Sequence, residues 1–249
     1  MNDFAAAGLG VSQIKEKDYW SVNKAEPVPN GVRIVTGPGT GFGQAFLVKS
    51  KFSPCYEVYP SEGGHVDFPA RSREDFELLE FARDYVENSN NIENLRGKAK
   101  TQRISIERVC AGPAVPLIYE FFKTKINEEE MPRVLETGPD AKKPDEITSM
   151  DIVSAGTNSQ NRDPLCRKVI EKFLDILAVE VGNHGLKCLP FGGIFLIGGV
   201  TNGISDLILN DDSFMNTLTE KGRLHDMMHR FPVLLVKPDV ELGLLGAEE

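Results

Sequence analysis

The segment that most constrains the fold is a glycine-rich turn between two apolar runs. Residues 37–43 read Gly-Pro-Gly-Thr-Gly-Phe-Gly, with β-branched and apolar residues at 32–36 and 45–49 on either side. Two such runs around a short glycine turn predict a β-hairpin with the glycines at its tip. The backbone amides of such a tip can bind an anion, with the hydroxyl of Thr40 as a further donor. The alternative is a plain tight turn, in which glycine supplies only positive φ.

The spacing within this turn excludes two common phosphate-binding loops. A dinucleotide fingerprint, Gly-x-Gly-x-x-Gly, needs glycine where Phe42 stands and a helix after the turn, whereas a strand is predicted there. A P-loop needs Gly-Lys followed by Ser or Thr, and this combination occurs nowhere in the chain. The candidates that remain are a hairpin tip that binds phosphate through its amides and the plain turn.

Helix and strand patterns alternate along the rest of the chain, which predicts the α/β class. The predicted elements are a helix opened by a capping box at Ser72 to Asp75, a helix from Ser105, a helix over 162–186, a strand over 194–197, helices within 204–230 and a strand over 233–236. On the first helix Phe76, Leu79, Ala82 and Val86 follow at helical spacing. The side chains expected on the buried side of the long helix are Leu165, Val169, Phe173, Ile176, Leu177 and Val179. Residues 88–103 and 125–146 are polar and predict surface loops.

Composition excludes several classes of protein. The 249 residues suffice for one large domain or a domain with an appendage. The 28 basic and 37 acidic residues give a net charge of −9, which argues against a nucleic-acid-binding face. No apolar run approaches the roughly 20 residues that span a bilayer, and the N-terminus lacks the basic region of a secretory signal, so a cytoplasmic protein is expected. The four cysteines are far apart and are expected to be buried thiols.

A polar turn follows the predicted hairpin. Glu62 and His65 flank two glycines in the segment 62–68, Glu-Gly-Gly-His-Val-Asp-Phe. The glycines disfavour a helix, and no other His or Cys lies close by, so a zinc site is not expected. A carboxylate and an imidazole on a turning backbone suit a ligand whose adjacent hydroxyls both donate and accept hydrogen bonds. The alternative is a solvated acid and a surface histidine.

Three further positions carry candidate chemistry, each with a plainer explanation. Gly198 and Gly199 follow the strand over 194–197, where open α/β sheets bind ligands, although close packing of a strand on a helix also explains them. Glu107 lies in the first turn of the Ser105 helix, where capping alone could account for it. Asn2 and Asp3 would mean nothing in isolation, because chain ends fray.

The order of these motifs makes the chain recognisable. It carries, in sequence, Asn-Asp-Phe, Ala-Glu-Pro, Gly-x-Gly-Thr-Gly-x-Gly, Glu-Gly-Gly-His-Val-Asp-Phe, Ser-x-Glu-Arg-Val-x-x-Gly-Pro, Phe-Gly-Gly-x-Phe-x-x-Gly-Gly and Gly-Leu-Leu-Gly. This series resembles the bacterial-type (group A) glucokinases, also found in some protists, within the hexokinase/actin-like superfamily. The resemblance runs from Asn2 to Gly246. Related repressor and kinase proteins carry a cysteine zinc motif, which is missing near His65.

The resemblance implies a fold, an activity and a set of roles. The fold would be an actin-like, ribonuclease H-like large lobe with a mixed sheet flanked by helices. The activity would be transfer of phosphate from ATP, with Mg²⁺, to the 6-hydroxyl of glucose. Asp3 would be the catalytic base. The implied glucose ligands are Asn2, Asp3, Glu62, His65 and Glu107, and the implied nucleotide ligands are Gly39, Thr40, Gly41, Gly198 and Gly199. Glucose and ATP would be the partners, without nucleic acid or membrane.

The chain departs from the family at its ends. Family members carry an upstream lobe with an Asp-x-Gly-Gly-Thr phosphate loop, and no such motif occurs here. We therefore expect a remnant of the small lobe at 1–12, a large lobe at 13–238 and the start of a return to the small lobe at 239–249. The expected activity is below that of a complete homologue. The alternatives are a non-catalytic sugar-binding or regulatory lobe and a kinase for another hexose. A homodimer is the commonest closed assembly, but the oligomeric state stays open.

Overall fold

The computed structural model describes residues 3–52, 55–88, 103–138, 141–160 and 162–247. The chain divides into two compact units, which we describe separately. The first comprises Met1–Gly64 and Leu174–Glu249, and the second comprises His65–Phe173. The chain therefore passes from one unit to the other twice. One passage lies inside the Glu-Gly-Gly-His segment.

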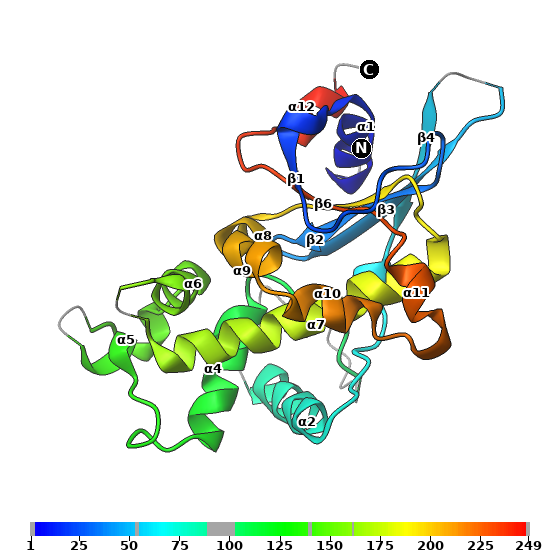
Figure 1. Cartoon of the computed structure of the whole chain (residues 1–249). Helices are drawn as coiled ribbons and strands as arrows, with labels where there is room; N and C mark the ends of the chain where they lie inside the picture. Colours follow the sequence, from blue (N-terminus) through cyan, green and yellow to red (C-terminus); the bar gives the residue numbers. More distant parts are fainter. Residues whose placement is uncertain (1–2, 53–54, 89–102, 139–140, 161, 248–249) are drawn as a thin grey trace. The chain divides into compact units, whose positions relative to one another are not determined.

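A six-stranded mixed sheet forms the centre of the first unit (Figure 1). Its strands are β1 (Tyr19–Ser21), β2 (Arg33–Pro38), β3 (Phe42–Lys49), β4 (Tyr56–Ser61), β5 (Gly193–Leu196) and β6 (Val233–Val236). They lie in the order β1-β6-β5-β2-β3-β4. Strand β5 runs parallel to β2 and β6, and the other neighbours are antiparallel. The predicted mixed sheet with flanking helices is confirmed.

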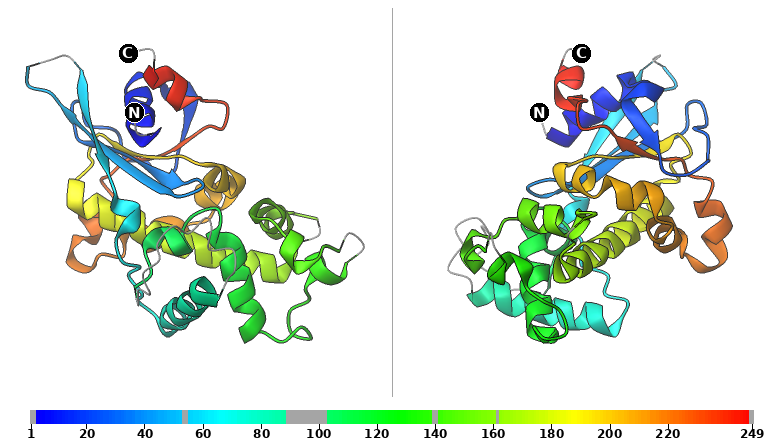
Figure 2. Two further views of the ribbon diagram at one scale, coloured as in Figure 1. Left: turned by 180° about the vertical axis from the view of Figure 1, so that it is seen from behind. Right: turned by 60° about the vertical axis from the view of Figure 1, so that its left-hand side comes forward.

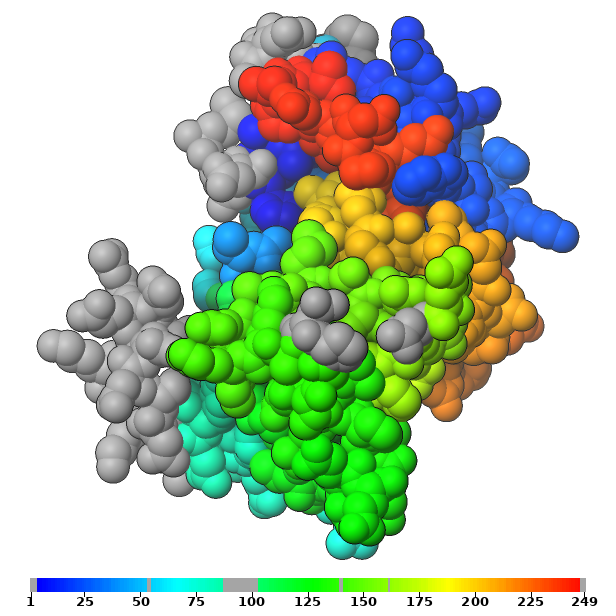
Figure 3. Space-filling view, turned by 90° about the vertical axis from the view of Figure 1, so that its left-hand side faces the viewer, coloured from blue at the N-terminus to red at the C-terminus, as the bar shows by residue number. Residues whose placement is uncertain are grey.

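Two helices from opposite ends of the chain cover one face of this sheet. Helix α1 (Asp3–Gln13) packs directly on α12 (Leu242–Ala247), with the backbone of Gly10 against the carbonyl of Leu242. Both views in Figure 2 place these helices side by side, and Figure 3 shows the C-terminal residues in red beside N-terminal ones in blue. The buried core beneath them consists of Ala7, Val11, Val35, Ala45, Leu47, Phe195, Leu234, Val236 and Leu242. The predicted lobe boundaries at residues 12 and 238 stay predictions.

The first unit contains further helices. They are the second half of α7 (Pro164–Cys188), α8 (Gly199–Gly203), α9 (Ser205–Asn210), α10 (Ser213–Thr219) and α11 (His225–Met228), with the 3₁₀ turns η1 (Glu16–Asp18) and η5 (Gly222–Leu224). A buried hydrogen bond joins Glu180 of α7 to Gln44 of β3. Side chains alternate across a strand, so this bond places α7 on the face opposite to that of Ala45 and α1.

The second unit is helical in the residues described. It contains α2 (Arg73–Asn88), α3 (Ile106–Val109), α4 (Ala114–Lys125), α5 (Val134–Thr137), α6 (Ser149–Thr157) and the first half of α7, with a 3₁₀ turn η4 (Pro144–Glu146). The 3₁₀ turn η2 (Gly63–His65) lies at its border. Its core is rich in large side chains that are almost fully buried, among them Leu78, Ile118, Tyr119, Phe121, Phe122, Ile152 and Phe173.

Most predicted elements form, with differences at their edges. The hairpin, the helix from Ser72, the long helix and both later strands are present, and all six predicted side chains of the long helix are buried. Phe76 belongs to the helical spacing of α2 but is 56% exposed, because α2 turns Asp75 and Leu78 inward. The helix from Ser105 ends at Val109, before Gly112-Pro113, and α4 begins after them. The expected loop 125–146 contains α5 and η4. Most of the loop 88–103 lies outside the described residues.

The cysteines match the expectation only in part. Cys110 and Cys166 are buried, whereas Cys188 is half-buried and Cys55 is exposed. Cys55 directly precedes β4, at the end of the connection from β3, where little can cover it. Among the helices described, none combines the length and apolar character needed to cross a membrane.

Two polar side chains are buried one turn apart on α7. Glu180 is 1% exposed and His184 is 4% exposed. Burial, and secondly the charge of Lys187, lowers the pKa of His184 from 6.5 to about 4. Burial raises the pKa of Glu180, although its hydrogen bond from Gln44 opposes this. A histidine with a lowered pKa loses stability as the pH falls, and a carboxyl with a raised pKa loses it as the pH rises.

The two groups therefore oppose each other, and a Glu180→Gln background isolates the histidine. Between pH 7 and pH 4.5 the unfolded chain protonates His184 and the folded chain largely does not. In that background His184 should cost about 2.5 kcal/mol of unfolding free energy over this interval. Adding His184→Met should remove that share of the pH dependence. Urea unfolding at both pH values measures the free energy of unfolding. If this free energy changed equally between pH 7 and pH 4.5 with and without His184, the assignment would be contradicted.

Candidate active site

The tip of the β2–β3 hairpin is shorter than predicted. The strands pair as far as Gly37 with Gly43 and Pro38 with Phe42, so the connection is only residues 39–41. The N–H of Gly39 donates to the carbonyl of Gly41 at 2.7 Å, which closes the turn. The donors that the tip can turn toward a phosphate are then the amides of Thr40 and Gly41 and the Thr40 hydroxyl. Thr40 is exposed, as such a role requires.

The second glycine pair lies against this hairpin. Strand β5 runs parallel to β2, and Gly198 follows it at the start of α8. Gly198 has φ of 118°, and a Cβ there would lie 2.2 Å from the carbonyl oxygen of Pro38. Only glycine accepts both conditions without displacing the hairpin. The two segments predicted to contact the nucleotide are therefore neighbours in one unit.

Gly198→Ala should be costly, and its neighbour offers a matched control. The strained φ and the clash with Pro38 should together remove about 2 kcal/mol or more of unfolding free energy. Gly199 has ordinary φ, and no atom lies within 4 Å of the place that its Cβ would take, so Gly199→Ala should change stability by less than about 0.5 kcal/mol. Thermal unfolding of both variants measures this contrast. Equal losses would mean that the close approach at Gly198 does not support the hairpin.

The N-terminal helix also reaches the hairpin. Asp3 is the first residue of α1, and its side chain lies outside the described residues, as does all of Asn2. The next residue, Phe4, places its ring against Gly43, where a Cβ would meet ring atoms at 1.8 Å. The start of α1 therefore lies at the start of β3. An isolated Asn-Asp pair gave no reason to expect a helix here, yet Asp3 opens one that packs on α12.

The turn that carries Glu62 rests on the same strand. Glu62 follows β4 and is exposed. Gly64 packs on the carbonyl of Phe42, and Gly63 packs on the side chain of Gln44. Phe42 and Gln44 of β3 thus contact the Glu62 turn, and Gly43 between them contacts the start of α1. In the first unit, the predicted base, the phosphate tip, Gly198 and Glu62 are carried by segments that meet at one end of β3.

The second unit brings together the other two predicted sugar ligands. His65 Nδ1 lies 3.9 Å from Glu107 Oε1. Backbone bonds hold their segments side by side, from Phe68 N to Ile104 O and from Ile106 N to Val66 O, each at 2.8 Å. Arg103 donates to the carbonyl of His65 at 2.7 Å. The carboxylate and the imidazole can therefore serve adjacent hydroxyls, as predicted for a sugar. The implied role of these residues as glucose ligands stays a prediction.

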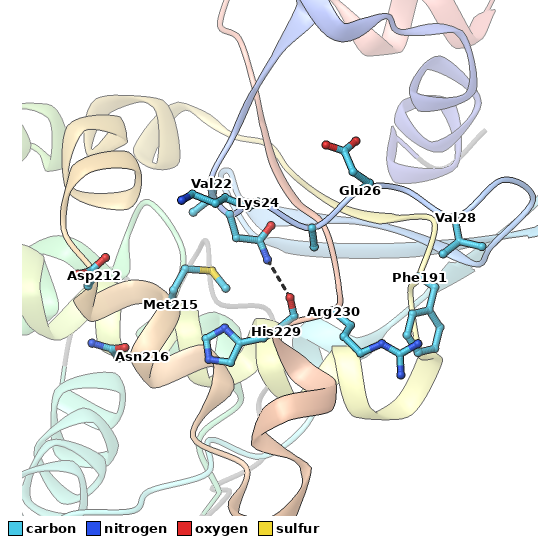
Figure 4. A pocket seen from close by; sticks show the side chains of 12 residues that line it. Val22, Lys24, Glu26, Val28, Phe191, Asp212, Met215, Asn216, His229 and Arg230 are labelled. Carbon is cyan, nitrogen blue, oxygen red and sulfur yellow. Dashed lines mark hydrogen bonds between the residues drawn. The ribbon is translucent and has the colours of Figure 1, made fainter.

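A separate pocket of about 700 Å³ opens in the first unit (Figure 4). It is lined by Val22, Asn23, Lys24, Ala25, Glu26, Val28, Phe191, Asp212, Met215, Asn216, His229 and Arg230. None of the predicted site residues lines it, but the start of the Ala-Glu-Pro motif does. Asn23 ties this segment to the chain before β6, because its amide donates to the carbonyl of Phe231 at 2.8 Å and accepts from Val233 N at 3.0 Å.

The comparisons with known proteins identify the family of the chain. The sequence model of the glucokinase family matches residues 1–249. A curated glucokinase of Nostoc punctiforme is 32% identical over 255 residues, which cover 99% of this chain and 69% of that protein. The chain belongs to the glucokinase family. The prediction made from the order of motifs is thereby confirmed.

Solved glucokinases share the fold. The crystal structure of a glucokinase from an Antarctic psychrotroph matches with a TM-score of 0.74 and 25% identity, over 100% of this chain and 66% of the other. A ROK family glucokinase from Streptomyces griseus, solved with glucose and AMPPNP, matches with a TM-score of 0.61 and 17% identity over 99% of this chain and 65% of the other. This family member thus spans about two thirds of the length of these relatives.

Proposed function

We propose that the protein transfers the γ-phosphoryl group of ATP to the 6-hydroxyl of glucose. The observation that carries the proposal is the meeting, at the start of β3, of the Asp3 helix, the glycine hairpin tip and Gly198. A base, a phosphate cradle and a nucleotide-side turn are the parts that phosphoryl transfer needs, because this reaction depends on positioning and charge stabilisation.

Each candidate residue has one task in this reaction. Asp3 accepts the proton of the 6-hydroxyl while the oxygen forms a bond to the γ-phosphorus and the bond to the β-phosphate oxygen breaks. Asn2, Glu62, His65 and Glu107 hold the other hydroxyls of the sugar. Their carboxylate, amide and imidazole groups supply both acceptors and donors, as a polyol requires.

The nucleotide side fits ATP with Mg²⁺. The tip offers the amides of Thr40 and Gly41 and one hydroxyl, which suit phosphate oxygens. Mg²⁺ prefers phosphate oxygens and water to an all-protein cage. The Thr40 hydroxyl is the side-chain oxygen at the tip that could meet the ion. Bound there, the ion would neutralise charge on the phosphates. Gly39, Gly198 and Gly199 would let the nucleotide approach the backbone closely.

Two measurements on the purified chain test the proposal. Titration calorimetry with glucose and with ATP measures binding, and an assay coupled to glucose 6-phosphate measures turnover in the presence of Mg²⁺. We expect glucose and ATP to bind and glucose 6-phosphate to form. Glucose binding without turnover would favour a sugar-binding or regulatory lobe. Turnover of another hexose in preference to glucose would change the substrate, and binding of neither ligand would reject the proposal.

Two further properties remain predictions. A cytoplasmic location is one of them, and cell fractionation tests it. A homodimer is the commonest closed assembly, and light scattering of the purified chain tests it.

A further inference from the structure

A buried polar pair lies behind the turn that carries Glu62. Gln44 of β3 is 4% exposed and Glu180 of α7 is 1% exposed. Gln44 Nε2 donates to Glu180 Oε1 at 3.0 Å. These residues are 136 positions apart and play no part in the roles described above. Burying an amide and a carboxyl costs free energy unless they are paired. We therefore expect this buried pair to have a role.

The other end of the same amide touches the sugar turn. A Cβ at Gly63 would lie 1.8 Å from Gln44 Oε1, so the amide fills the space that the glycine leaves. Gln44 also pairs with Ser61 in the β3–β4 ladder, and the Ser61 hydroxyl accepts a hydrogen bond from Gly63 N at 3.0 Å. The backbone that follows Glu62 is thereby held between Ser61 and Gln44. The position of the Gln44 amide is set in turn by Glu180.

We propose that Gln44 and Glu180 are positioning residues for the sugar-binding turn that begins at Glu62. This inference rests on the proposed function, because it assigns a task to side chains behind the proposed sugar ligands. Glu180 fixes the orientation of the Gln44 amide, and the amide fixes the backbone of Gly63. The turn then presents Glu62 at one set place on the sheet. Neither residue touches the substrate.

Conservative and disruptive variants separate this task from simple packing. Glu180→Gln keeps an oxygen that accepts from Gln44, whereas Glu180→Met and Gln44→Met remove the hydrogen bond at similar side-chain volume. The reversed pair, Gln44→Glu with Glu180→Gln, restores one carboxyl and one amide in exchanged places. The single variant Gln44→Glu sets two buried carboxyl groups against each other.

The kinetic test compares glucose with ATP. Gln44→Met and Glu180→Met should raise KM and the dissociation constant for glucose about tenfold, since a buried hydrogen bond to a carboxyl is lost. KM for ATP should stay within about twofold. In Glu180→Gln and in the reversed pair, KM for glucose should stay within about threefold of the parent value. In Gln44→Glu alone, KM for glucose should rise by more than this. Equal rises in both KM values, or no rise in any variant, would overturn the inference.

A second readout does not depend on catalysis. Hydrogen exchange of the amides of residues 62–65 in the ligand-free protein should quicken about tenfold in Gln44→Met and return toward the parent rate in the reversed pair. Circular dichroism checks that each variant is folded. If a methionine variant does not fold, the comparison is made with Glu180→Gln and the reversed pair. If the parent binds no glucose but exchange responds as expected, the proposed function fails and the positioning role stands. If glucose binds and exchange does not respond, the positioning role fails.

Discussion

Replacing Asp3 with asparagine should remove turnover and leave glucose binding nearly unchanged. Asparagine has almost the same shape as aspartate and can still hydrogen-bond a hydroxyl, but it cannot accept the proton of the 6-hydroxyl. A general base contributes roughly 100- to 10,000-fold to rate, so we expect kcat to fall by about a thousandfold. The dissociation constant for glucose should stay within about threefold. The coupled assay and calorimetry measure the two quantities.

A matched control for this experiment is Glu16→Gln. Glu16 is an exposed acid in the 3₁₀ turn η1 of the same unit, and its neutralisation should alter neither constant. Retention of turnover in Asp3→Asn would exclude Asp3 as the proton acceptor. A parallel loss of glucose affinity and turnover would instead make Asp3 a binding residue.

Lys172→Met should strongly destabilise the second unit. Lys172 is 8% exposed, and its ammonium group contacts the carboxylates of Asp75 and, at 3.2 Å, Glu74. Burial acts to raise the pKa of Asp75, but the bond from Lys172 and the amides of Arg71 and Ser72 lower it below its ordinary value. Removing the lysine leaves a buried charge without its partner, which costs about 3–5 kcal/mol.

Two variants show whether this loss comes from the buried charge. Lys168 lies one turn earlier on α7, 39% exposed and 3.7 Å from Glu74, so Lys168→Met should cost less than about 1 kcal/mol. The double variant Asp75→Asn with Lys172→Met removes both charges and should recover part of the stability. Urea unfolding of the three proteins gives the comparison. A loss in Lys172→Met no greater than in Lys168→Met would show that the pair adds nothing to stability.

Sequence patterns predicted the elements whose signals are local. The hairpin formed because β-branched runs adjoin a glycine turn, and α2 began where Ser72 and Asp75 exchange capping bonds. The missed elements had conflicting local signals. Strand β4 contains Pro60, which argues against a strand, and yet it pairs at the edge of the sheet, where proline is tolerated. Helix α1 lies at a chain end, where fraying is the default, but α12 covers it.

The sequence named candidate residues for the site but did not predict their arrangement. The order of motifs selected Asp3, Thr40 and Glu62, because a family is recognised by residue types at set intervals. The spacing of residues in the sequence does not predict that Phe4, Gly63 and Gly64 all pack against the start of β3. The bond from Gln44 to Glu180 likewise joins residues that no local pattern relates. Contacts of this kind depend on how a strand and a helix from distant parts of the chain stack.

The crowding at the start of β3 makes this strand intolerant of displacement. Phe42, Gly43 and Gln44 each meet a different group, and successive residues of a strand face opposite sides of the sheet. If β3 slid by a single position against its neighbours, Gln44 would turn toward the Phe4 ring and a side chain would replace Gly43 there. The contacts of Phe4, Gly63 and Gly64 with β3 would then be lost together. Insertions and deletions between residues 38 and 44 should therefore be far rarer among functional variants than substitutions at the exposed Val48 of the same strand.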